Sequence, residues 1–253
     1  MANKDLKSIY DRSCSRPLTK SSKGSPSFKP SMLGSPCLRK VWYSYNKVEE
    51  DTPFPLSSSR VVNLGTAIGK MLAEAYDREG ILIKFKKPDG TFYTDDSGPD
   101  YEFRVQSPEL GVRLGKIDLT VVLDDGLWLG EIKSINDFGY SNLTGPKPDH
   151  LIQGVLYLYL FNKALKDGEY AHIEELKPYT KANGIRFLYY QKDKSQMKEF
   201  VVTSADQIFK QIVLKIETVK DFSAKDALPP KTPDYCNSCS WKLKCDANRK
   251  KSL

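Results

Sequence analysis

The sequence predicts one α/β domain built around a mixed β-sheet. Two observations lead to this prediction. Apolar residues recur at helical spacing on both sides of a stretch, residues 81–134, in which the spacing changes to every second residue. Glycine, proline and aspartate interrupt that stretch where hairpin turns are expected. With 253 residues, the chain is long enough for one substantial core and a small appendage.

The N-terminal part is expected to be a flexible arm followed by helices. Residues 1–30 are rich in Ser, Lys and Pro and show little apolar periodicity, which is typical of a loosely packed segment. A short helix is predicted after Pro36, a loop over 50–59, and a longer helix over 61–77. The apolar stripe of that longer helix consists of Leu64, Ile68, Met71, Leu72 and Ala75. Residues 31–253 are therefore expected to form the single folded domain.

The central and C-terminal parts contain the predicted sheet and two more helices. Asp-Gly turns are expected at 88–90 and 124–126. The predicted strands cover 101–106, 112–123, 127–134, 185–191 and 198–203. One helix should begin near Pro148 and bury Leu151, Val155, Leu158 and Leu165. A second should run from a capping box at 204–207 to about Asp221. No internal repeat is present.

Composition indicates a globular protein without a membrane span. The chain is 40% hydrophobic and 28% charged, and its longest apolar run, 151–161, is shorter than the roughly 20 residues that cross a bilayer. The beginning of the sequence has no apolar secretion signal, so a cytoplasmic location is expected. The net charge of +7 suits a polyanionic partner such as DNA, although solubility alone could account for it.

Two carboxylates and an ammonium are predicted to converge on adjacent strands. Asp118 lies in an apolar strand, where an unpaired carboxylate would cost several kcal/mol. Glu131 and Lys133 share a face of the next strand, and a hairpin centred on 124–126 places Asp118 opposite about Ile132. Carboxylates of this kind hold Mg²⁺ or Mn²⁺, and a lysine beside them can assist the attack of water on a phosphodiester. An exposed Glu–Lys pair is the alternative.

A polar pair is expected on the helix that follows. Gln153 and Tyr157 are four residues apart and therefore share one helical face, where an amide and a phenol could reach a phosphate or Lys133. The alternative is a core tyrosine beside a solvated glutamine. His150, one turn earlier, could touch the same phosphate, but a lone histidine is more often structural.

The motifs Gly-x-Ile-Asp at 115–118, Glu-Ile-Lys at 131–133 and Gln-x-x-x-Tyr at 153–157 resemble the core of the PD-(D/E)XK nucleases. More narrowly, they are similar to the RecB-like exonucleases, including the nuclease domain of the AddB subunit and the CRISPR-associated RecB-like exonucleases. The resemblance implies a nuclease core over 61–222. It also implies that Asp118, Glu131 and the backbone carbonyl of Ile132 bind the metal and that Lys133 is catalytic.

The five cysteines are concentrated at the two ends of the chain. Cys37 is followed by Leu-Arg, and the tail contains Cys236, Cys239 and Cys245. Four thiolates suit zinc or an iron–sulfur cluster, and one CxxC pair with two single cysteines favours 4Fe-4S over zinc. The same pattern resembles the cluster-binding cysteines of the RecB-like exonucleases. Residues 31–45 and 230–253 are thus expected to form a joint cluster region, with Cys14 left as a free thiol.

One position departs from the family pattern. Relatives of this kind carry a histidine metal ligand in a context like Gly-Thr-Ala-Ile-His, whereas this chain has Gly65-Thr66-Ala67-Ile68-Gly69. Glu102 could replace the missing ligand, and Glu74 is a poorer substitute because it projects elsewhere on the helix. The number of metal ions is therefore open.

The sequence thus predicts a metal-dependent DNA exonuclease that acts on single strands or duplex ends in recombination, repair or end processing. The alternative is a catalytically impaired DNA-binding scaffold that retains the fold and the cluster. A restriction-type endonuclease would need a sequence-reading region, which the chain does not show. Trp42, Tyr43 and Tyr140 are candidates to stack on unpaired bases. Recombination or replication proteins are possible partners, while oligomeric state, cleavage polarity and strand preference are not predicted.

Overall fold

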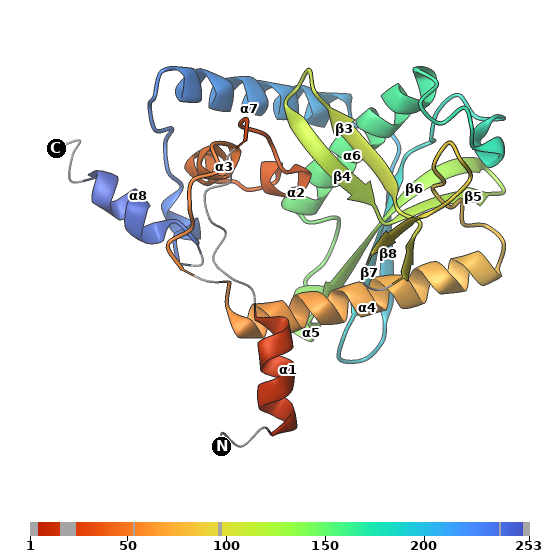
Figure 1. The fold of residues 1–253 in the computed structure, drawn as a ribbon, viewed down its shortest axis with the longest axis horizontal. Coiled ribbons are helices and arrows are strands. Elements are labelled where there is room, and N and C mark those ends of the chain that lie inside the picture. Colours follow the sequence, from red (N-terminus) through yellow and green to blue (C-terminus); the bar gives the residue numbers. More distant parts are fainter. Residues whose placement is uncertain (1–4, 16–23, 53, 96–97, 238, 250–253) are drawn as a thin grey trace.

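A four-stranded mixed sheet lies at the centre of the computed structural model, which describes residues 5–15, 24–52, 54–95, 98–237 and 239–249 (Figure 1). The strand order is β5-β6-β7-β8. The strands are β5 (Leu119–Leu123), β6 (Gly126–Ile135), β7 (Ile185–Gln191) and β8 (Met197–Val202). β6 and β7 are parallel and the other pairs are antiparallel. The predicted α/β class with a mixed sheet is confirmed.

Helices cover both faces of this sheet. On one face, α4 (Leu56–Arg78) buries Ile68 and Leu72 against β5 and β6. On the other face, α6 (Pro148–Lys166) lies on β7, where an added Cβ at Gly154 would come within 2.5 Å of Phe187. Alternate residues of β7 are fully buried, as expected when successive side chains point to opposite faces. The result is a helix–sheet–helix sandwich.

Two small hairpins form sheets of their own beside the central one. β1 (Tyr93–Asp95) pairs with β2 (Gly98–Asp100), and β3 (Phe103–Ser107) pairs with β4 (Val112–Ile117). The single strand expected over 112–123 is therefore wrong, because the chain bends at Asp118 and its two halves join different sheets. β5 also stands at the edge of the four-stranded sheet, although an apolar strand of this kind is expected at the centre of a sheet.

The N-terminal segment differs from the flexible arm expected over 1–30. Its described residues include α1 (Leu6–Cys14), which packs against α4, and Phe28, which is only 1% exposed. Phe28 stacks on Tyr45, with 4.3 Å between the ring centroids. The short α2 (Pro30–Leu33) and the predicted helix after Pro36, α3 (Leu38–Tyr45), follow. Aromatic packing over a long sequence separation gives this region its order, and local composition does not reveal such contacts.

The helix boundaries contain further corrections. α4 begins at Leu56, inside the loop expected over 50–59, and two residues of its predicted apolar stripe, Leu64 and Met71, are each 48% exposed. α7 (Asp206–Ala224) begins after Ala205, and no side chain caps it, so the capping box predicted there is wrong. The remaining helical segments are α5 (Asp137–Ser141), η1 (Glu174–Leu176), η2 (Pro233–Tyr235) and α8 (Lys242–Arg249). Within the described ranges, no helix is both long and apolar enough to cross a membrane.

Candidate functional site

Asp118 occupies the bend between β4 and β5, beside the middle of β6. Its Oδ2 accepts a hydrogen bond from the backbone amide of Ile132, at 2.7 Å. Leu119 pairs with Gly130 in the hairpin, so the next pair along the ladder places Asp118 opposite Glu131. The predicted register was wrong by one residue because only Asp124 and Asp125 form the turn, while Gly126 is already paired with Leu123. The carboxylates are therefore closer neighbours than the sequence indicated.

Glu131 and Lys133 project from β6 toward α6. Glu131 is 1% exposed, and its Oε1 lies 2.6 Å from Lys133 Nζ. The other carboxylate oxygen, Oε2, is buried and accepts no hydrogen bond from any described residue. Buried polar atoms are nearly always paired, and an anionic oxygen is among the most costly to leave alone. A cation is the natural partner for such an atom.

The charges of this site act strongly on one another. Burial and the neighbouring Glu131 raise the pKa of Asp118 to about 7, and burial raises the pKa of Glu131 despite Lys133. Burial alone would lower the pKa of Lys133, but the Glu131 and Asp118 carboxylates outweigh it and raise that pKa. The two carboxylates therefore repel each other, and one ammonium does not fully compensate them. A divalent cation would relieve this repulsion.

Gln153 and Tyr157 extend the polar site along α6. Gln153 Oε1 accepts a hydrogen bond from Lys133 Nζ at 3.2 Å, and Gln153 Nε2 donates to the Tyr157 hydroxyl at 3.1 Å. Both side chains are buried. Burial raises the pKa of Tyr157 and Glu131 adds to the effect, so the phenol stays protonated. The predicted face of the helix thus meets Lys133 directly and fixes the position of its ammonium.

Gly115 is a site residue whose role the sequence did not reveal. A Cβ at this position of β4 would lie 2.6 Å from Tyr157 Cε1 and 2.9 Å from Pro30 Cγ. Contacts this short require a neighbour to move. The glycine therefore lets the tyrosine ring approach the strand that leads to Asp118.

Gly115→Ala is expected to lower the free energy of unfolding by about 1–3 kcal/mol, because overpacking displaces Tyr157. Gly69→Ala is the matched control: a Cβ at Gly69, inside α4, meets nothing within 4 Å. That change should instead raise the free energy of unfolding by about 0.5–1 kcal/mol. Urea unfolding measures both, and equal values for the two variants would contradict the close approach.

A second carboxylate group lies next to the site. Lys116 Nζ binds Asp100 at 2.5 Å and Glu102 at 3.2 Å. Asp100 also binds Arg104 at 2.9 Å and is 6% exposed. Burial raises the pKa of Glu102 to about 7, and Asp118 adds to the effect. The pKa of Glu102 therefore depends on the charge of Asp118, as expected of a substitute ligand that lies close to it. The sequence analysis did not predict the buried Asp100, which is paired with both Lys116 and Arg104.

The other minor candidates differ in their placement. His150 Nδ1 lies 2.8 Å from the Tyr189 hydroxyl, which also accepts the backbone amide of Lys147. Burial and the positive charge of Lys133 lower the pKa of His150 to about 4, so this imidazole is neutral near pH 7. It could meet a phosphate only as a hydrogen-bond partner. Glu74 is exposed on α4, and among the described residues it makes no hydrogen bond or ion pair with the site residues.

The four predicted cluster cysteines line one cavity between α3, η2 and α8. Cys37 precedes α3, Cys236 and Cys239 form a turn, and Cys245 lies in α8. Burial raises the pKa of Cys239, and the nearby Cys37 and Cys245 add to the effect. The guanidinium of Arg39 lies 3.5 Å from Cys245 Sγ. α3 and α8 accordingly lie at the same end of the molecule (Figure 1).

The remaining cysteine and aromatic candidates lie elsewhere. Cys14 is buried against α4, and Asn63 Nδ2 donates to its sulfur at 3.3 Å. Tyr43 and Tyr140 are only 3% and 8% exposed, so neither can stack on a base as predicted. Trp42 is partly buried and packs against the core.

The residues present fit both groups that the sequence implied. Two buried carboxylates, one with an unpaired oxygen, suit a hard divalent cation, and four thiols around one cavity suit a cluster. In the described ranges, no three His, Cys, Asp or Glu side chains are already arranged as a metal site. Fold and site together define an α/β protein with a mixed sheet and a buried carboxylate–lysine centre.

Comparison with known proteins adds little to this description. The chain matches no known family and no curated protein. Among the solved structures to which it is similar is one titled "Crystal structure of SSO0001", with 14% identity over 88% of each chain and a TM-score of 0.46. That similarity is too low to carry an argument, so the function must be argued from the site itself.

Proposed function

We propose that this protein is a metal-dependent deoxyribonuclease, an exonuclease of the PD-(D/E)XK superfamily related to the RecB-like enzymes. The observation that carries the proposal is the grouping of Asp118, Glu131 and Lys133, with a buried carboxylate oxygen of Glu131 that has no hydrogen-bond partner among the described residues. Structural ion pairs rarely leave such an atom without a donor. A phosphodiester hydrolase uses both features, the anions for a metal and the ammonium for the reacting phosphate.

In this proposal, some of the site residues bind the metal and others position the attacking water. Asp118, Glu131 and the carbonyl of Ile132 would hold Mg²⁺ or Mn²⁺, which when bound polarises the phosphate and acidifies water. Lys133 would orient the attacking water and stabilise the charge that develops on the phosphate. Gln153 holds Lys133 through its amide oxygen, and Tyr157 holds Gln153 in turn. This chain of contacts fixes the ammonium before the substrate arrives, which limits the reorganisation that the reaction requires.

DNA is the proposed substrate because the chain carries a surplus of seven positive charges. Lysines and arginines that neutralise phosphates release condensed counterions, so affinity should fall as salt rises. The proposal places the protein in the cytoplasm, in recombination, repair or end processing. The four cysteines would hold a 4Fe-4S cluster that joins the two ends of the chain.

The proposal is tested by incubating the purified protein with end-labelled single- and double-stranded DNA. Hydrolysis with Mg²⁺ or Mn²⁺, and none with a chelator, is expected. A protein that binds DNA but degrades neither form with either metal would leave only the scaffold function. One that binds no DNA would contradict both functions.

Gly69 favours the scaffold alternative, since relatives of the resembled family carry a histidine there. The structure leaves open space at this position, and Gly65, one turn earlier, lies beside Ser134 at the end of β6. A side chain at position 69 can therefore be added on the helix that covers the catalytic strand.

Gly69→His is expected to lower the Mn²⁺ concentration needed for half-maximal cleavage several-fold, because it restores the histidine that supplies a metal ligand in the resembled family. Ala67→His, at an exposed position of the same helix, is the matched control and should change nothing. The measurement is the initial rate against Mn²⁺ concentration. Identical curves for both variants would show that position 69 does not reach the metal.

A further inference from the structure

The cavity that the four cysteines line has a positively charged wall. Arg39, Lys40, Lys231 and Lys242 contribute to its lining, together with the carboxylate of Asp246. That carboxylate lies 3.4 Å from Lys231 Nζ, so it pairs with one of the four cations. In the part of the chain that the structure describes, the other three cations pair with no carboxylate. The wall therefore favours an anionic centre at the sulfur atoms.

Two of the cysteines also lie near a cation or a backbone donor. Burial raises the pKa of Cys239, but the Trp241 backbone amide and the charge of Lys40 act in the opposite direction. Burial lowers the pKa of Lys215 on α7, and the nearby Cys37 opposes that shift. Amides and ammonium groups in such positions stabilise a thiolate more than a neutral thiol. The surroundings of these two cysteines therefore agree with the charge of the wall.

Arg39 makes the most specific contact with a sulfur atom. It follows Cys37 by two residues on α3, and its Nη1 donates to Cys245 Sγ at 3.5 Å. Its Nε donates to the backbone carbonyl of Pro229 at 2.8 Å. Pro229 lies in the segment after α7, which passes α3 before it reaches α8 (Figure 1). One guanidinium thus joins α3, that segment and α8.

The contact between Arg39 and Cys245 is of little use to a neutral thiol. A thiol sulfur is a weak acceptor, whereas a guanidinium is permanently charged and carries five N–H donors. The same contact to a thiolate is charge-assisted and therefore considerably stronger. Cys245 is only 8% exposed, so a thiolate at this position needs a neighbouring donor. The placement of Arg39 accordingly suits Cys245 in the anionic form that binds a metal.

We propose that Arg39 is a positioning residue of the cysteine site, where its guanidinium stabilises the bound cluster and raises its reduction potential through the sulfur of Cys245. This inference rests on the proposed cluster and adds a residue that is not a ligand. A hydrogen bond to a ligand sulfur withdraws electron density, which favours the reduced and more negative form. The second bond, to Pro229, keeps the segment that leads to the C-terminal cysteines beside α3.

The test compares Arg39→Met and Arg39→Lys with the wild-type chain, all purified anaerobically. Methionine retains an unbranched apolar stem but removes the charge and every donor. Lysine retains the charge, but its single ammonium replaces the two-armed guanidinium. Iron release to a ferrous chelator should be roughly 10- to 100-fold faster for Arg39→Met and intermediate for Arg39→Lys.

The reduction potential is the measurement that a purely structural role would not change. It is obtained by a dye-mediated titration followed in the visible spectrum. The potential should be lower in Arg39→Met than in wild type, with Arg39→Lys between them, because the methionine variant loses both the N–H donor and the positive charge beside the sulfur.

Lys242→Met is the matched control, because it removes one positive charge from the same cavity. Lys242 is exposed on α8, and its side chain makes no hydrogen bond to a sulfur among the described residues. Solvent screens such a charge, so both quantities should change far less than in Arg39→Met. Equal changes in the two methionine variants, or Arg39→Lys indistinguishable from wild type, would show that charge alone acts and would overturn the contact.

The remaining outcomes separate this inference from the proposed cluster. A brown Arg39→Met variant with the iron release and potential of wild type would overturn the role of Arg39 and leave the cluster intact. Unchanged iron release and potential with weaker DNA binding would assign Arg39 to a phosphate and also overturn it. If Arg39→Met is insoluble, the comparison of Arg39→Lys with wild type decides. A colourless wild-type protein would contradict the cluster, and this inference would fail with it.

Discussion

Replacing Asp118 by Asn, Glu131 by Gln or Lys133 by Ala is expected to reduce DNA hydrolysis by roughly a thousand-fold or more. The first two changes remove anionic oxygens that would hold the cation. The third removes the ammonium that Glu131 and Gln153 hold in place at 2.6 and 3.2 Å. Because the three groups act as a unit, the double variant Asp118→Asn/Glu131→Gln should be little slower than either single variant.

The two carboxylate substitutions should leave the fold intact, which separates a loss of chemistry from a loss of structure. Asn at position 118 can still accept the Ile132 amide, and it removes one of two carboxylates that repel each other. In metal-free buffer, Asp118→Asn is therefore expected to unfold at a urea concentration no lower than wild type. Initial rates on labelled DNA, urea unfolding and DNA affinity in chelator are the three measurements.

Glu199→Gln is the matched control for these variants. This carboxylate lies on β8, is 47% exposed and pairs with Arg186 at 3.3 Å. A surface pair of this kind contributes little to stability, and the control should cleave DNA at the wild-type rate. If Asp118→Asn cleaved as fast as Glu199→Gln, the carboxylate–lysine group would be a structural ion cluster and the proposed mechanism would be wrong.

The part of the site that lies on neighbouring elements could be predicted from the sequence. A hairpin with a two-residue turn must bring Asp118 beside Glu131, and strand alternation must put Glu131 and Lys133 on one face. Helical periodicity likewise put Gln153 and Tyr157 on one face. The error of one residue in the register arose because a two- and a three-residue turn have similar sequences.

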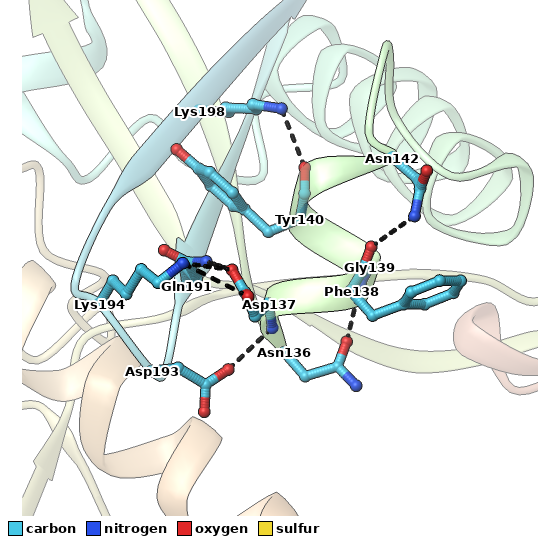
Figure 2. A network of polar contacts seen from close by, with 10 residues as sticks. All are labelled: Asn136, Asp137, Phe138, Gly139, Tyr140, Asn142, Gln191, Asp193, Lys194 and Lys198. Atoms are coloured by element: carbon cyan, nitrogen blue, oxygen red, sulfur yellow. Dashed lines mark hydrogen bonds and ion pairs between the residues drawn. The ribbon is translucent and has the colours of Figure 1, made fainter.

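The features that depend on contacts between distant segments could not be predicted. The close approach of Tyr157 to Gly115 involves β4 and α6, and the bend at Asp118 arises because β4 pairs with β3 rather than extending into β5. The position of α5 likewise depends on contacts of Asp137 with Gln191 and Asp193, more than fifty residues later in the chain (Figure 2). In each case, local propensity is overridden by packing that no window of the sequence contains.

Removing one cysteine of the proposed cluster is the second change with a large expected effect. Anaerobically purified protein should be brown and contain about four irons per chain. Cys236→Ala should lose both the iron and most of the soluble protein, because Cys236 shares its cavity with Cys37 from the other end of the chain. Ligation across so long a loop should contribute on the order of a few kcal/mol to folding.

Cys14→Ala distinguishes the cluster from a general sensitivity to cysteine loss. Cys14 is buried and contacts Asn63, and it is absent from the cavity that the other four cysteines line. Its variant should keep the brown colour and the iron, whereas Cys37→Ala, Cys239→Ala and Cys245→Ala should behave like Cys236→Ala. Iron analysis and the visible absorption spectrum measure the result. A colourless, folded wild-type protein with one zinc per chain would contradict the cluster and assign the four thiols to a tetrahedral metal site.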